Sequence, residues 1–198
     1  MQDLDIRGAG NLLGAEQSGF ITDMGFETYQ KILAEAMEEL GVETGITTKG
    51  RNDSFVSDCT IETDQLALIP DSYIDVTAEK IRIYKELDSL DSDKQTEILK
   101  SNLEDRFGKM PDELSRLFDI VKIRRLGQKL GFEKIIIKNG VMIAFFISNP
   151  LSQYYKSAMF SRILEKISSC PGLFELKQND SKLRIFVRNV ESISKAFE

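Results

Sequence analysis

The chain has 198 residues, of which 41% are hydrophobic and 29% are charged, and it is long enough to bury a core of its own. No apolar run reaches the roughly 18 residues that span a bilayer, and the first residues carry two aspartates, which argues against secretion and membrane insertion. With two cysteines and no histidine, the sequence gives little support to a zinc site or a disulfide framework. We therefore expect a bacterial-type cytoplasmic protein with reduced cysteines.

The net charge of −6 lies entirely in the first quarter of the chain. Residues 1–50 hold three basic and nine acidic side chains, whereas the remainder has 23 of each sign and is neutral. Non-specific duplex binding draws most of its affinity from surplus lysine and arginine. Autonomous DNA binding by this chain should consequently be weak.

A glycine-rich loop near the start of the chain is the first candidate site. Residues 3–19 place Arg7 after two aspartates and before four glycines. Glycines permit tight turns and close approaches, and an arginine there could engage a phosphate or a carboxylate bidentately. Taken alone, such a loop is more often a surface turn with a solvated arginine.

A helix is expected over residues 26–40, where apolar residues recur at steps of three and four. Its apolar stripe needs a partner, which is either this chain's own domain or a missing neighbour. The polar, glycine-containing stretch that follows predicts a domain boundary. We place the end of a first region at residue 48, a linker at 49–57 and a compact domain at 58–198.

Two short extended segments, 59–62 and 66–70, are expected to precede three helices. The first helix is marked by Ile81, Tyr84, Leu87 and Leu90. Ser92 and Gln95 form a capping box for the second, whose apolar positions run from Ile98 to Phe107 before Gly108. The third begins after Pro111 and ends at Gly131.

Two hairpins and two further helices complete the expected domain. Asn139-Gly140 is a strong hairpin signal between 132–138 and 141–147, and a second hairpin is expected between 173–177 and 182–187. A helix over about 155–167 separates them, and a short helix closes the chain. This order predicts an α+β fold, with three to five helices on a small, mainly antiparallel sheet.

Several segments together resemble a known family. The stretch Asp3 to Gly19 is similar to the segment after the last helicase motif in two groups of superfamily 2 DNA motors. Four later segments resemble the carboxy-terminal domain of only one of these groups, the transcription-repair coupling factors: Leu68–Asp71, Tyr84-Lys85, Leu103–Gly108 and Leu126–Gly131. The resemblance implies the end of a translocation motif followed by a regulatory domain.

The resemblance also implies roles for particular residues. Arg7 and Gln17 would couple ATP hydrolysis to movement on duplex DNA, supported by Gly8, Gly10 and Gly14. Asp105 and Arg106 would contact an amino-terminal module that resembles the binding site of the damage-recognition protein, and this contact would keep the resting protein closed. An acidic residue common in the family is replaced by Asn102.

The resemblance further implies a parent protein that displaces stalled RNA polymerase and recruits excision repair. This chain has no phosphate-binding loop GxxxxGK[ST], so we expect no ATP hydrolysis, cofactor or metal here, with ATP and Mg²⁺ belonging to the parent motor. Its partners would be duplex DNA, RNA polymerase and the damage-recognition protein.

The alternative is a self-contained nucleic-acid-binding or protein-interaction module. It rests on Arg7 and on a local excess of basic residues between positions 122 and 138. Helical spacing spreads these over more than one face, so a solvated surface is favoured over a phosphate track. The basic residues are Lys122, Arg124, Arg125, Lys129, Lys134 and Lys138.

Overall fold

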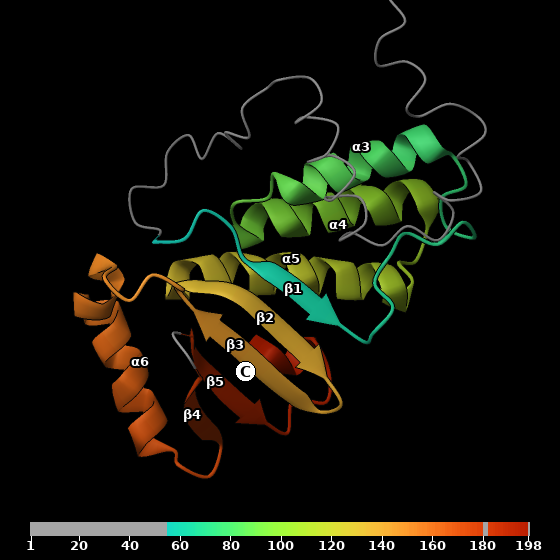
Figure 1. Ribbon diagram of the computed structural model, residues 1–198. Coiled ribbons are helices and arrows are strands. Elements are labelled where there is room, and N and C mark those ends of the chain that lie inside the picture. Colours follow the sequence, from blue (N-terminus) through green and yellow to red (C-terminus); the bar gives the residue numbers. More distant parts are fainter. Residues whose placement is uncertain (1–54, 180–181, 198) are drawn as a thin grey trace, which may run out of the picture.

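The computed structural model describes residues 55–179 and 182–197, and the helices and strands are labelled as in Figure 1. Within these residues, five strands form one sheet in the order β1-β2-β3-β5-β4. The strands are β1 (Thr60–Thr63), β2 (Phe132–Lys138), β3 (Val141–Phe146), β4 (Phe174–Asn179) and β5 (Lys182–Arg188). Of the pairings between these described strands, only β1–β2 is parallel, so the sheet is mixed but mainly antiparallel, as predicted.

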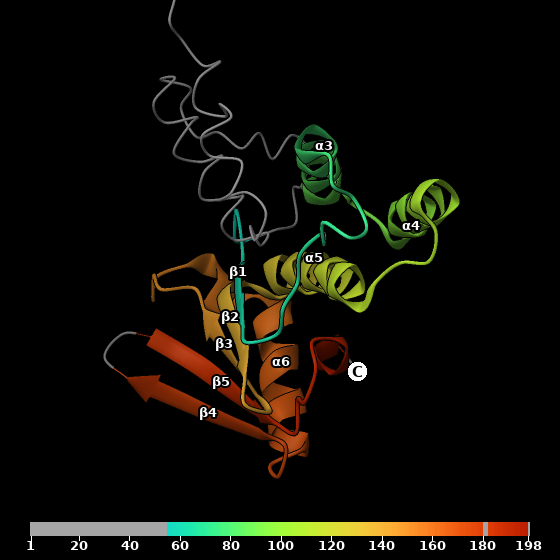
Figure 2. The same ribbon diagram turned by 90° about the vertical axis from the view of Figure 1, so that its right-hand side faces the viewer.

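In the described residues, four α-helices and two short 3₁₀ segments accompany the sheet. The helices are α3 (Thr77–Asp88), α4 (Asp93–Phe107), α5 (Asp112–Leu130) and α6 (Ala158–Ser169), with η2 (Gln153–Lys156) and η3 (Ser194–Phe197). Figure 2 shows α5, α6 and η3 on the same side of the sheet, with α3 and α4 beyond α5. The fold is α+β, and the predicted class is confirmed.

The core lies between α5 and one face of the sheet. Side chains alternate along the strands, and those that face the helices are buried, among them Ile135, Ile137, Ala144 and Ile185. Gly127 of α5 lies so close to β1 that an added Cβ would stand 2.6 Å from the Cys59 sulfur. The absence of a side chain at residue 127 therefore lets the helix approach the sheet edge.

Both predicted hairpins are present. Asn139 and Gly140 have φ values of 53° and 74°, the left-handed conformation that a two-residue turn between β2 and β3 requires. The second hairpin joins β4 and β5 as expected. The predicted fourth helix divides into η2 and α6, because Ser157 ends one and caps the other through Phe160 N at 3.2 Å.

The expected extended segment at 66–70 is not a strand. The Ile69 N–H donates to the Tyr84 hydroxyl at 3.2 Å, and the Pro70 carbonyl accepts from Tyr73 and Ile74 in a turn. These bonds attach the segment to α3 and leave no ladder for a neighbouring strand. The apolar residues in this run are buried as a loop packed on helices, with the exception of Leu66.

Candidate interdomain contact site

Helix α4 carries the predicted contact residues and begins with the predicted capping box. Ser92 Oγ accepts from the Gln95 N–H at 3.3 Å, while Gln95 Oε1 accepts from the Ser92 N–H at 3.2 Å. Only Leu99 and Leu103 are buried along the helix, and it lies at the outside of the helical layer (Figure 2). Most of its surface therefore faces away from the domain.

Asn102 and Asp105 lie together on this exposed surface. They are three residues apart on the helix, so their side chains are neighbours, and both are exposed. The side chain of Asp105 makes no hydrogen bond or ion pair with any other residue in the described part of the chain. An acidic group is thus presented next to an amide.

Arg106 instead turns toward α3. Its Nη1 lies 2.8 Å from Glu79 Oε1, and its guanidinium carbon lies 4.8 Å from the centre of the Phe107 ring. Glu79 also accepts from Arg82 at 2.7 Å, and Arg82 and Arg106 together lower the pKa of Glu79. Arg106 therefore joins α3 to α4, in addition to any contact it makes outside the domain.

The end of α4 is held by an aromatic contact that the sequence did not indicate. The Tyr73 hydroxyl lies 3.1 Å from the Leu103 carbonyl and 3.0 Å from that of Gly108, and its ring packs on Phe107 at 5.7 Å. Burial, with the nearby Glu104 charge, raises the pKa of Tyr73. Neither Tyr73 nor Glu79 could be linked to this site by spacing, since both reach it only through the tertiary fold.

Ile98, one of the apolar positions that mark this helix in the sequence, is not part of the core. Its side chain is 53% exposed, one turn before Asn102 on the same side of α4. The buried row follows Leu99 and Leu103, and a residue beside that row points about 100° away from it. The exposed strip of α4 therefore combines an apolar, an amide and an acidic side chain.

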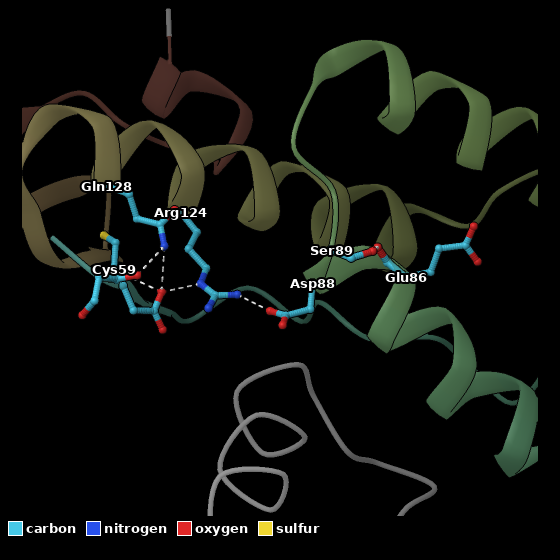
Figure 3. Close-up of polar contacts among 8 residues, drawn as sticks. Cys59, Glu86, Asp88, Ser89, Arg124 and Gln128 are labelled. Carbon is cyan, nitrogen blue, oxygen red and sulfur yellow. Dashed lines mark hydrogen bonds and ion pairs between the residues drawn. The ribbon is translucent and has the colours of Figure 1, made fainter. Parts of the chain in front are cut away.

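A second polar cluster joins the start of β1 to two helices. Arg124 Nε donates to Asp58 Oδ1 at 2.7 Å, and its Nη1 donates to Asp88 at the end of α3 (Figure 3). Gln128 also reaches Asp58, at 3.2 Å. Burial alone would lower the pKa of Arg124, but its bonds to the two aspartates raise it overall. The cluster therefore attaches the residues just before β1 to α5, and α5 to the end of α3.

Cys59, next to this cluster, has no features of a nucleophile. It is fully buried, and burial together with the Asp58 charge raises the pKa of its thiol to about 12, against the opposing effect of Arg124. At neutral pH it remains a protonated, inaccessible thiol. No group of three or more potential metal ligands occurs among the described residues, and none of their helices is long and apolar enough to cross a membrane.

The basic segment between positions 122 and 138 does not form a phosphate track. Arg124 and Arg125 are mostly buried and paired, with Asp93 as the partner of Arg125. Lys134 and Lys138 lie on the sheet, and both pair with Glu62. The segment is divided between a helix and a strand, and its charges are largely neutralised within the domain.

The predicted translocation residues Arg7, Gly8, Gly10, Gly14 and Gln17 lie outside the described residues, as does the expected helix at 26–40. The boundaries proposed at residues 48 and 57 stay predictions.

The described residues thus form an α+β domain that exposes Ile98, Asn102 and Asp105 along one side of α4. Comparison with known proteins identifies the family. Residues 63–157 match the TRCF domain. The chain is 34% identical over 190 residues to a transcription-repair-coupling factor of Rickettsia bellii, covering 95% of this chain and 15% of that protein.

Other relatives agree with this match. Transcription-repair-coupling factors of Bacillus subtilis and Escherichia coli are 40% and 36% identical, over 63% and 67% of this chain and 10% and 11% of their own lengths. The crystal structure of a C-terminal domain of transcription-repair coupling factor superposes with a TM-score of 0.55 at 23% identity, over 70% of this chain and 84% of that one. The chain belongs to the transcription-repair-coupling factor family, and it spans only 10% to 15% of the length of these relatives.

Proposed function

We propose that the domain regulates a bacterial, cytoplasmic, ATP-driven DNA translocase by masking a binding surface on another part of the same protein. The parent would displace stalled RNA polymerase on duplex DNA and recruit the damage-recognition protein of excision repair. The observation that carries the proposal is the exposed strip Ile98, Asn102 and Asp105, which has no partner role inside the described domain.

The chemistry of the strip suits a reversible intramolecular contact. An exposed carboxylate beside an apolar side chain can pair with a basic and apolar surface, and the charge sets the orientation of docking. Because masking is an equilibrium, it needs only a free-energy difference between the closed and open states. Asn102 removes one negative charge that the family often has here, so the contact should be weaker than in relatives that carry an acid.

The test is binding in trans. The 198-residue chain is titrated with the purified amino-terminal module of the parent, and Asp105→Ala should weaken association at least about tenfold, because the module's basic group then loses its partner. Glu165→Ala, on exposed α6, removes the same charge elsewhere and should leave binding unchanged. No association of the wild-type chain, or equal loss in both variants, would remove the masking role.

For the amino-terminal region we propose the role implied by family membership. Arg7 and Gln17 would couple the nucleotide state of the motor to movement on DNA, with Gly8, Gly10 and Gly14 allowing the loop to turn. ATP and Mg²⁺ would be bound by the motor of the parent and not by this chain.

A further inference from the structure

The sheet has a second face that no described helix or strand covers. Figure 2 shows the helices on one side of the strands only. Strand register places three rows of side chains across this outer face. The middle row is Glu62, Ile136, Ile143, Phe186 and Glu175; the flanking rows are Lys134, Phe145, Arg184 and Lys177 on one side, and Lys138, Val141 and Arg188 on the other.

The outer face carries a positive charge that the rest of the domain lacks. It holds five cations and two carboxylates, although residues 51–198 as a whole are neutral. Several of these cations remain accessible, with side-chain exposures of 48% for Lys177 and 65% for Arg188. Both form ion pairs with Glu175, at 3.0 Å from Lys177 Nζ to Oε1 and 3.3 Å from Arg188 Nη2 to Oε2. A ligand with its own negative charges could replace such solvent-exposed pairs at little cost.

Planar groups lie at the centre of the face. Phe145 and Phe186 are diagonal neighbours on β3 and β5, and each is half-buried. The guanidinium of Arg184 lies 5.9 Å from one ring and 5.8 Å from the other. Aromatic rings and guanidinium planes are the groups on which unpaired bases stack, and cations beside them contact the backbone phosphates.

The shape of the outer sheet face favours single-stranded nucleic acid over duplex. A broad sheet face cannot enter a groove of B-DNA, and the bases of a duplex are not free to stack on protein rings. Rows two residues apart along a strand are about 6.6 Å apart, a spacing that lets several phosphates of one strand meet the flanking cations. An acidic peptide would use the same cations but has no need of Phe145, Arg184 and Phe186 as planar groups.

We propose that this outer sheet face, centred on Phe145, Arg184 and Phe186, binds single-stranded nucleic acid. The affinity is modest, within the roughly 10⁻⁴ to 10⁻⁶ M of non-specific binding, because the two carboxylates offset part of the charge. With about three net phosphate contacts, the logarithm of the binding constant falls with the logarithm of salt with a slope of about −2.

The experiment is fluorescence anisotropy of labelled 15-nucleotide oligo(dT) and oligo(U) with the full 198-residue chain at low salt. Phe186→Leu and Phe145→Leu keep the apolar surface but remove stacking, and each should weaken binding at least about fivefold. Arg184→Gln should weaken binding similarly. Glu175→Gln should tighten binding, because it removes a repulsion and frees Lys177 and Arg188. The ratio of the two oligonucleotides reports whether DNA or RNA is preferred.

Arg162→Gln is the matched control, since it removes one positive charge from exposed α6 on the other side of the sheet. It should leave the affinity unchanged, and circular dichroism shows whether each variant is folded. The proposal is overturned if blunt duplex of the same length binds as well as the single strand, or if Phe186→Leu and Arg184→Gln bind like wild type. Binding of a glutamate-rich 15-residue peptide with no binding of oligonucleotides would also overturn it and assign the face to an acidic protein.

Discussion

Among the described glycines, Gly131 has the least room for a side chain. It ends α5 with φ of 80°, and an added Cβ would lie 2.2 Å from the ring of Tyr154. Tyr154 is fully buried, and its hydroxyl donates to the Leu130 carbonyl at 2.6 Å. Its ring also contacts Phe55 and Phe160, at 5.3 and 5.4 Å. Both the end of α5 and the packing of the Tyr154 ring therefore require that residue 131 has no side chain.

Gly131→Ala should lower the free energy of unfolding by about 3 kcal/mol, from left-handed strain of about 1 kcal/mol plus overpacking of about 2 kcal/mol. Gly140→Ala is the matched control, because Gly140 has φ of 74° with nothing within 4 Å of its position. Gly140→Ala should lower the free energy of unfolding only by the left-handed strain of about 1 kcal/mol. Urea unfolding measures both, and equal losses would show that Tyr154 moves aside without cost.

At the scale of elements, the ion pair between α3 and α4 affects the position of the exposed strip of α4. Arg106 bridges the helices through Glu79, while the Asp105 side chain beside it makes no hydrogen bond or ion pair within the described domain. Arg106 can therefore contribute to docking in two ways, either by touching the partner or by positioning α4. These roles respond differently to a change in Glu79.

Glu79→Gln separates the two roles, since it weakens the bridge and leaves Arg106 in place. If Arg106 touches the amino-terminal module, Glu79→Gln should preserve or strengthen binding in trans, whereas Arg106→Ala weakens it. A parallel loss in both variants would instead assign Arg106 to positioning α4. Calorimetric titration of the two variants distinguishes these outcomes.

The sequence predicted elements well where local signals agreed. The capping box at Ser92, the stop at Gly131 and the turn at Asn139-Gly140 each specify a boundary by backbone chemistry alone, and all three are present. The run at 66–70 was expected to be extended and is a loop, and the exposure of Ile98 was not foreseen, because hydrophobicity does not reveal what a side chain packs against. The partners of a side chain are set by tertiary packing, as for Glu79 with Arg106 and Ile69 with Tyr84.

The candidate site was predictable only in part. Asp105, Arg106 and Asn102 came from resemblance to a family; the structure places them on the exposed side of α4, and their contact role stays a prediction. The outer sheet face could not be foreseen, because Phe145, Arg184 and Lys177 come from three strands and meet only through the register. In the sequence, the visible basic cluster was the segment at 122–138, whose charges the fold mostly pairs.

At the scale of the whole molecule, residues 1–50 are acidic and residues 51–198 are neutral, and we predict a different role for each part. We expect Arg7→Ala in the full-length parent to leave folding and nucleotide binding intact and to abolish most displacement of stalled polymerase. The physical reason is that a bidentate phosphate or carboxylate contact cannot be replaced by a methyl group. A polymerase-displacement assay with the variant checks this, and normal displacement would exclude the coupling role.

The masking role is tested most directly by the affinity of the full-length parent for the damage-recognition protein of excision repair. If the domain covers that binding surface, Asp105→Ala should open the parent and raise the affinity severalfold, toward that of a parent lacking residues 58–198. Glu165→Ala should leave it as in wild type. Equal affinity in the wild-type, Asp105→Ala and truncated proteins would contradict the account.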